Sequence, residues 1–250
     1  MNICASLVVR NEINRFLAPC IEHLRAFTDR IVVLDDASDD GTEHWLRDQA
    51  DEQLIVERQE VSTFYRHEGQ TRTRLLEVTL EQEPTHIVNL DADELVSDGP
   101  ALRAMIEADP DVPAWHLPIE EVWAANEGGY FIRDDGAWNQ GRTLAWRVPQ
   151  LGRLAFPNRA LACGRVPLQL RSVRAQPSGV SLLHVGWLDE RERVVRHARY
   201  TKHDNGRFHA GRHLASILWP PEKVGLQARA WPAGLLSWRD AILEHAGVTA

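Results

Sequence analysis

Three carboxylates fall within four residues in Asp91-Ala92-Asp93-Glu94, directly after the apolar run Ile87-Val88-Asn89-Leu90. In a turn that follows a strand, the first and third of these side chains can point the same way. Hard divalent cations such as Mg²⁺ and Mn²⁺ take oxygen ligands from one or two carboxylates and from substrate phosphates. A cation held in this way neutralises charge that develops on a departing diphosphate. The pattern predicts a cation and diphosphate site at Asp91 and Asp93.

The elements before these acids alternate between strand and helix signals. Apolar runs and helical periodicity predict strands at 3–9, 31–34, 54–57 and 85–90 and helices at 14–27 and 69–81. Thr42 is expected to cap a further helix, and another helical pattern covers 188–205. This order predicts an α/β fold with a mostly parallel sheet and helices on both faces. Such sheets bind ligands at the carboxyl ends of their strands.

Two more segments accompany the strand-end acids, in a recognisable order and spacing. They are Ser6-Leu7-Val8-Val9-Arg10-Asn11-Glu12 and Ile31-Val32-Val33-Leu34-Asp35-Asp36-Ala37-Ser38-Asp39-Asp40-Gly41-Thr42. With Asn89-Leu90-Asp91-Ala92-Asp93-Glu94 they make the chain resemble the family 2 glycosyltransferases, nearest to the branch of lipopolysaccharide-core glucosyltransferases. The resemblance covers residues 3–98 well and the rest in patches. It implies a single Rossmann-like GT-A domain.

The resemblance also implies roles for individual residues in donor binding. Asp36 is expected to hydrogen-bond the nucleobase, usually uracil, and the chain at Val9 and Arg10 to line the same pocket. A carboxylate suits this role because it accepts from the imino N–H of the base. Asp91, Ala92 and Asp93 are expected at the ribose, diphosphate and metal. Arg72, favoured over Arg74, is expected at the base or ribose side of the donor.

His184 follows two leucines and precedes a helical stretch that is rich in arginine. In the branch that the chain resembles, a histidine in a similar setting completes the metal shell. The implied metal ligands are therefore Asp93, Asp91 and His184, with Mn²⁺ or Mg²⁺ as the cofactor, and imidazole suits Mn²⁺ better. A histidine after two leucines is otherwise typical of a core, and this alternative stays open.

The stretch from Gly136 to Leu188 holds no Asp or Glu and seven arginines: Arg142, Arg147, Arg153, Arg159, Arg165, Arg171 and Arg174. Its partner is a diphosphate, a phosphorylated or lipid-linked acceptor, nucleic acid or the acidic half of the chain itself. Inverting transfer, which the resemblance implies, needs a general base for the acceptor hydroxyl. Since this stretch supplies none, we expect Asp135 or Glu121 to be the base.

Tryptophans are frequent in the second half of the chain. Flat aromatic faces suit stacking on a sugar ring or on a base. We expect one or two of the following to be exposed in an acceptor cleft: Trp115, Trp123, Trp138 and Trp146.

Composition narrows the classes of protein. With 28 Lys+Arg against 36 Asp+Glu, the formal charge is −8, the wrong sign for holding nucleic acid by bulk charge. Three cysteines without metal spacing favour a reducing compartment. No segment approaches the ~18 apolar residues of a spanning helix. We expect a cytoplasmic protein, at most peripheral to a membrane.

Together these features predict a metal-dependent inverting glycosyltransferase that uses a nucleoside diphosphate sugar, with UDP expected. Residues 1–113 are expected to bind the donor, 114–213 to bind the acceptor and supply His184, and 214–250 to pack as a tail on the body. Glycan, lipid-linked, protein and modified-DNA acceptors all stay open. The alternatives are a non-catalytic carbohydrate- or nucleic-acid-binding relative, or a nucleotidyltransferase. The latter needs a glycine-rich phosphate loop after the first strand, which Arg10-Asn11-Glu12-Ile13 does not supply.

Overall fold

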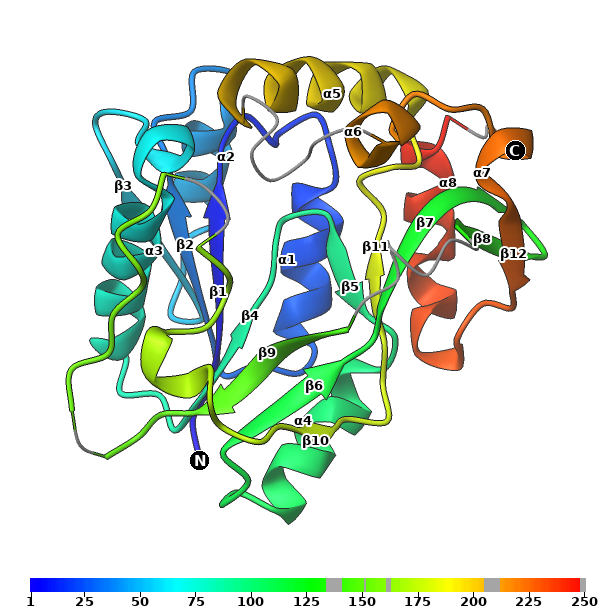
Figure 1. Ribbon diagram of the computed structural model, residues 1–250. Coiled ribbons are helices and arrows are strands. Elements are labelled where there is room, and N and C mark those ends of the chain that lie inside the picture. Colours follow the sequence, from blue (N-terminus) through cyan, green and yellow to red (C-terminus); the bar gives the residue numbers. More distant parts are fainter. Residues whose placement is uncertain (134–140, 151, 161–162, 205–211, 248–250) are drawn as a thin grey trace. The chain divides into compact units, whose positions relative to one another are not determined.

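The computed structural model describes residues 1–133, 141–150, 152–160, 163–204 and 212–247 (Figure 1). The chain forms two compact units, and it crosses between them several times. Unit 1 consists of Met1–Ala92, Gly99–Leu117 and Arg142–Val180. Unit 2 consists of Asp93–Asp98, Pro118–Gly141 and Ser181–Ala250. This division does not test the predicted donor, acceptor and tail segments, which stay predictions.

Unit 1 is built on a seven-stranded sheet of order β10-β6-β9-β4-β1-β2-β3. Its strands are β1 (Ile3–Val9), β2 (Arg30–Asp35), β3 (Leu54–Arg58), β4 (His86–Asn89), β6 (Ala114–Leu117), β9 (Arg142–Arg147) and β10 (Gln176–Pro177). Strands β1 to β4 are parallel, whereas β9 runs antiparallel to β4 and β6. The predicted α/β fold with a mostly parallel sheet is confirmed.

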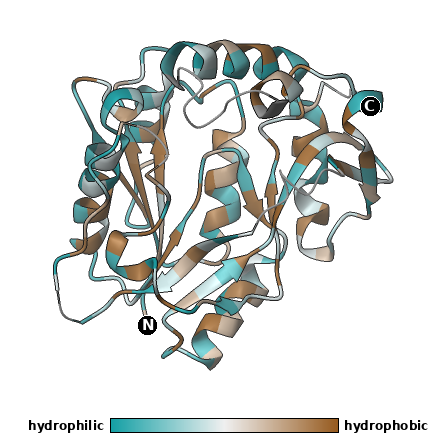
Figure 2. Cartoon of the chain, viewed as in Figure 1, coloured by the Kyte–Doolittle hydropathy of each residue, from teal (hydrophilic) through white to brown (hydrophobic). Residues whose placement is uncertain are grey.

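Helices cover both faces of the parallel part of this sheet. Unit 1 contains α1 (Leu17–Arg25), α2 (Thr42–Gln49), α3 (Phe64–Leu80), α4 (Gly99–Ala108) and a short 3-10 turn (Leu168–Leu170). Figure 1 shows α1 and α3 on opposite sides of β1 and β2. Leu75 and Val78 of α3 pack on Val32 and Leu34. Figure 2 shows how apolar β1 and β2 are, as strands buried on both faces must be.

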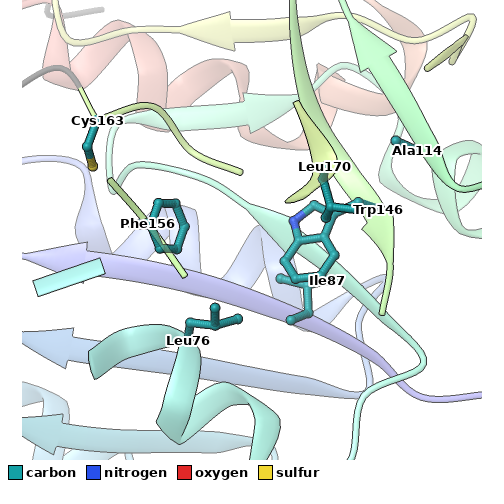
Figure 3. Close-up of a cluster of buried hydrophobic side chains, with 7 residues drawn as sticks. All are labelled: Leu76, Ile87, Ala114, Trp146, Phe156, Cys163 and Leu170. Atoms are coloured by element: carbon teal, nitrogen blue, oxygen red, sulfur yellow. The ribbon is translucent and has the colours of Figure 1, made fainter. Parts of the chain in front are cut away.

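A second cluster joins α3 to the segment that follows β9. It contains Leu76, Ile87, Ala114, Trp146, Phe156, Cys163 and Leu170 (Figure 3). Trp146 is fully buried. Because Phe156, Cys163 and Leu170 come from one irregular segment, burying them holds that segment against β4 and α3. The arginine-rich segment of unit 1 is thereby fixed beside the sheet.

Unit 2 is built on a five-stranded sheet of order β12-β8-β7-β11-β5. Its strands are β5 (Glu94–Val96), β7 (Ile119–Asn126), β8 (Gly129–Arg133), β11 (Leu182–His184) and β12 (Leu226–Arg229). Its helices are α5 (Glu190–Asp204), α6 (Arg212–Ser216), α7 (Pro221–Val224), α8 (Arg239–His245) and a 3-10 helix (Ala233–Trp238). The helix predicted at 188–205 is confirmed as α5. Trp123, Trp187, Ile217 and Val224 form one buried cluster of this unit.

The tryptophans differ from expectation. Trp115, Trp123 and Trp146 are at most 2% exposed, so none of them offers a face to an acceptor. They belong to the cores because their large apolar area is buried with most benefit there. Trp138 lies outside the described residues. In the part of the chain that is described, no helix is both long and apolar enough to cross a bilayer.

Candidate functional site

The turns that follow β1 and β2 are tied to each other at the carboxyl edge of the unit 1 sheet. Asn11 donates from Nδ2 to Asp39 Oδ1 at 2.7 Å, and its backbone N–H donates to Ser38 Oγ at 3.0 Å. Thr42 Oγ1 accepts from the N–H groups of Glu12 and Ile13 at 2.8 and 2.9 Å. Both sequence segments therefore have a structural role, which is to hold two strand ends together.

The expected capping role of Thr42 is wrong in its detail. Helix α2 has Gly41 at its N-cap position. Thr42 is the first helical residue, its N–H donates to Asp40 Oδ1 at 2.9 Å, and its hydroxyl serves the neighbouring turn. Asp40 lies two residues before Thr42, and an aspartate at that spacing accepts the backbone N–H in an Asx turn.

Asp36 lies at the end of β2 and is fully buried. Its Oδ1 accepts from Gln59 Nε2 at 2.6 Å and Thr63 N at 2.8 Å, and its Oδ2 accepts from Ser62 Oγ at 2.6 Å and Phe64 N at 3.3 Å. The carboxylate thus anchors the start of α3, where backbone N–H groups need acceptors. To accept a nucleobase N–H it must exchange one of these bonds.

Val9 and Arg10 adjoin Asp36 as the sequence predicts. The backbone O of Val9 accepts from Asp36 N at 2.9 Å, and Arg10 donates from Nη1 to the backbone O of Asp36 at 3.1 Å. The three residues form one connected group at the ends of β1 and β2. Their predicted role in base binding stays a prediction.

Arg72 is buried on α3 and paired within unit 1. Its Nε donates to Glu68 Oε1 at 2.7 Å, while Glu68 Oε2 accepts from the backbone N–H of Cys163 at 3.1 Å. The guanidinium also lies 5.4 Å from the ring centroid of Phe64. Arg74, in contrast, pairs with Glu57 at 2.6 Å and is partly exposed. These contacts give Arg72 a structural role beside the one predicted from sequence.

Asp91 follows β4 in unit 1, two residues beyond the strand end. Its Oδ2 accepts from Arg165 Nη2 at 2.5 Å, and its side chain remains 38% exposed. Ala92, beside it, is buried. Arg165 belongs to the acid-free arginine-rich stretch, so at least one arginine of that stretch pairs with the acidic half of the chain itself. Arg147 pairs likewise with Asp111 at 3.2 Å.

Strand pairing in unit 2 brings the other predicted residues together. β11 lies between β5 and β7, and His184 is in register with Glu94 on one side and Glu121 on the other. Asp93 immediately precedes β5, and its backbone O accepts from Val185 N at 2.9 Å. The side chains of Asp93, Glu121 and His184 are all buried.

His184 is held by a carboxylate on each ring nitrogen. Nδ1 lies 2.5 Å from Glu121 Oε2, and Nε2 lies 3.4 Å from Asp93 Oδ1. Trp187 Nε1 donates to the same Glu121 oxygen at 2.6 Å. Burial alone lowers the pKa of His184, but the negative charges of Glu121 and Asp93 outweigh it and raise that pKa well above its ordinary value.

The second oxygen of Asp93 pairs with an arginine of α5. Arg196 Nη2 donates to Asp93 Oδ2 at 2.6 Å, and Nη1 lies 3.5 Å from His184 Nε2. A Cβ on Gly186 would collide with both Asp93 and Arg196. The glycine after Val185 is therefore required for this close approach.

Asp93 and His184 fit a divalent cation. Two ligands about 2.1 Å from an octahedral ion lie about 3 Å apart when adjacent, close to the observed 3.4 Å. A ligating histidine also characteristically donates its other N–H to a carboxylate, as Nδ1 can to Glu121. Asp91 belongs to the other unit, and no group of three or more ligating side chains is assembled for a metal within the described ranges. The three-ligand set stays a prediction.

The two candidate bases differ in what is known of them. Glu121 is committed to His184 and Trp187, which favours a positioning role over proton abstraction from an acceptor. Its neighbour Glu120 accepts from the hydroxyl of Tyr130. Asp135 lies outside the described residues.

Residues 5–113 match a family model described as glycosyl transferase family 2. This part of the chain is similar to the family 2 glycosyltransferases. The family predicted from the strand-end motifs is confirmed, whereas its nearness to the lipopolysaccharide-core branch stays a prediction. A search of curated proteins finds no match to the sequence.

Several solved structures are similar to this glycosyltransferase. One is a mannosyltransferase from Pyrobaculum calidifontis in complex with GDP-Man and Mn²⁺, at 17% identity over 99% of this chain and 86% of the other, with a TM-score of 0.46. Another is a 4-diphosphocytidyl-2C-methyl-D-erythritol synthase, at 18% identity over 58% of this chain and 75% of the other, with a TM-score of 0.37. A third is glucosyl-3-phosphoglycerate synthase from Mycobacterium tuberculosis in complex with Mn²⁺, UDP and phosphoglyceric acid. It is 18% identical over 48% of this chain and 43% of the other, with a TM-score of 0.34.

Some residues of the glycosyltransferase that contact the predicted site were not singled out from sequence. Arg165 and Arg196 each belonged to a series of arginines without a distinguishing neighbour. Gln59 and Ser62, which hold Asp36, fall in an irregular segment. Trp187 carried one usable signal, since a tryptophan three residues after a candidate ligand histidine can place its N–H beside that ring.

Proposed function

We propose that the enzyme transfers the sugar of a UDP-sugar donor to an acceptor hydroxyl, with inversion at the anomeric carbon. A divalent cation held by Asp93 and His184 assists this transfer. One observation carries this proposal. His184 Nε2 faces Asp93 Oδ1 at 3.4 Å while Glu121 holds Nδ1 at 2.5 Å. A carboxylate behind the ring and a second carboxylate in front of it are the surroundings of a metal-binding histidine.

In this proposal the residues of unit 1 bind the nucleotide part of the donor. Asp36 accepts the imino N–H of the base, in exchange for the rotatable hydroxyl of Ser62, and Arg10 and Val9 line that position. Arg165 is partly buried beside Asp91, where its guanidinium is suited to a phosphate oxygen. Arg72 supports the start of α3 through Glu68.

In unit 2, Glu121 accepts from Nδ1 of His184, so that Nε2 is the ring nitrogen left to bind the cation beside Asp93. When bound there, Mn²⁺ or Mg²⁺ supplies neutralisation of the negative charge on the leaving diphosphate. Holding the acceptor oxygen in line with the anomeric carbon accounts for much of the remaining catalysis. The buried position of Asp93 and His184 strengthens these interactions by excluding water.

Deprotonation of the acceptor requires a base that is not already committed. Since Glu121 is engaged with His184 and Trp187, we keep Asp135 in this role. The acceptor is a hydroxyl of a glycan, lipid-linked molecule, protein or modified DNA. We also propose, from the sequence, that the protein is cytoplasmic.

A thermal-shift panel tests the proposal. UDP, GDP and their sugar conjugates are each added with Mn²⁺ or with EDTA, because a ligand that binds only the native state raises Tm by mass action. We expect UDP and UDP-sugars to raise Tm only with Mn²⁺, and Asp93→Asn to remove that shift. Asp240→Asn, an exposed acid of unit 2, is the matched control and should behave as wild type. A Mn²⁺-dependent UDP shift that survives in Asp93→Asn overturns the assignment.

A further inference from the structure

The guanidinium of Arg196 is the cationic partner of Asp93 in this structure. Its Nη2 donates to Asp93 Oδ2 at 2.6 Å, and its Nη1 lies 3.5 Å from Nε2 of His184. The guanidinium therefore faces both groups that are proposed to hold the metal. All three side chains are buried in unit 2.

The packing around Arg196 keeps the guanidinium in this position. It stacks on the ring of Trp187, with Cζ 4.7 Å from the ring centroid, and Trp187 in turn stacks on Trp123 at 5.8 Å. Trp187 is itself fixed by its hydrogen bond to Glu121. Gly186 leaves the space in which Asp93 and Arg196 meet. This is a built ion pair of the interior, unlike a surface pair between mobile side chains.

A divalent cation cannot join this arrangement without a cost. An ion on Asp93 Oδ1 and His184 Nε2 would lie close to the guanidinium, and like charges repel strongly where water is excluded. Removing Arg196 without a substitute, however, leaves buried carboxylates with less compensating positive charge. The ion pair and the metal therefore compete for the same carboxylate.

We propose that Arg196 is the exchangeable counter-cation of Asp93, which weakens binding of free divalent metal and couples metal binding to the arrival of the donor. This inference rests on the proposed function, since it takes Asp93 and His184 as metal ligands. Free metal must displace Arg196 or bind against its charge. Metal that arrives with a diphosphate brings additional oxygen ligands, and the released guanidinium gains an anionic partner.

Calorimetric titration of the full chain with Mn²⁺ alone, and with Mn²⁺ in the presence of saturating UDP, tests this inference. Arg196→Gln keeps a polar side chain of similar reach but removes the charge. We expect it to bind Mn²⁺ alone about tenfold more tightly, as loss of one charge-assisted competitor predicts. The gain should be smaller with UDP present, so that UDP and Mn²⁺ are less coupled in the variant.

Two further variants make the result interpretable. Arg191→Gln changes an exposed arginine of the same helix and should leave both titrations unchanged. Arg196→Lys keeps the charge, so its affinity for Mn²⁺ alone should stay near that of the wild type. It also provides a variant that can be measured if Arg196→Gln does not fold. Unchanged or weaker Mn²⁺ binding in Arg196→Gln, or tighter binding in Arg196→Lys than in Arg196→Gln, overturns the inference.

Asp93→Asn separates this inference from the proposed function. If Asp93→Asn abolishes Mn²⁺ binding and Arg196→Gln leaves it unchanged, the metal site is right and the counter-cation role is wrong. If Asp93→Asn leaves Mn²⁺ binding intact, the proposed metal site itself is wrong, and the counter-cation role is lost with it.

Discussion

Glu121 and His184 face each other across paired strands, with Oε2 of Glu121 2.5 Å from Nδ1 of His184. The same oxygen accepts from Trp187 Nε1 at 2.6 Å. One carboxylate therefore sets the orientation of two rings, one of which presents Nε2 to Asp93. Its negative charge also helps to raise the pKa of His184 against the opposing effect of burial.

Replacing Glu121 tests its positioning role. In Glu121→Gln the amide no longer carries the charge that orients and polarises the imidazole, so Mn²⁺ affinity should fall about 10- to 100-fold. Calorimetry with Mn²⁺ and UDP measures this loss. Glu127→Gln, an exposed acid in the turn after β7, should bind as wild type. If the Glu121 variant instead bound Mn²⁺ normally but lost turnover alone, Glu121 would be the general base.

Asp36→Asn should destabilise the fold. The change turns one acceptor oxygen of a fully buried carboxylate into an NH₂ group that faces donors from residues 59–64. We expect the free energy of unfolding to fall by about 2–4 kcal/mol, measured by urea denaturation. Ser62→Ala removes only one of the four bonds and should cost about 1 kcal/mol. Equal stability of Asp36→Asn and wild type would contradict the role of Asp36 as an anchor of α3.

Arg165→Gln should weaken donor binding. Arg165 is partly buried and paired with Asp91, and loss of its charge removes a charge-assisted donor from the proposed diphosphate position. We expect the Kd for UDP with Mn²⁺ to rise about tenfold. Arg153→Gln, an exposed arginine of the same acid-free stretch, serves as the control. An equal effect of both substitutions would mean that general positive charge, and not Arg165 in particular, attracts the nucleotide.

The thiols predict a pH dependence of stability. Burial, with the nearby carboxylates of Asp29 and Glu68 respectively, raises the pKa of Cys4 and of Cys163 to about 12. Above the ordinary thiol pKa the unfolded chain loses these protons while the native chain retains them. The free energy of unfolding should therefore fall as pH rises from about 9 toward 12, by up to about 1.4 kcal/mol per pH unit for each thiol.

Denaturation series between pH 8 and 11 measure this slope. Cys163→Ala should make the slope shallower, even though the loss of its buried sulfur lowers stability at every pH. The native protein should also resist iodoacetamide at pH 8, because all three cysteines are buried. Rapid alkylation of the folded protein, or an unchanged slope in Cys163→Ala, would contradict this account.

The amino-acid sequence alone determined the order of the first four strands and the first three helices of unit 1, and the family that they resemble. Apolar runs of four to eight residues report buried parallel strands, and acids that directly follow such runs must lie at the carboxyl edge of the sheet. Asp36 and Asp91 were identified for this reason as acids at the ends of strands. The pattern is local, so it needs no knowledge of what packs against it.

Tertiary structure alone decided which charges meet. Glu121 and His184 are 63 residues apart, Asp91 and Arg165 are 74 apart, and Asp93 and Arg196 are 103 apart. Nothing local distinguishes Arg165 or Arg196 from their neighbouring arginines. The return of β11 between β5 and β7, and the burial of Phe156 and Cys163 beside α3, select them. Long-range pairing of this kind depends on the packing of whole elements, which no spacing along the chain encodes.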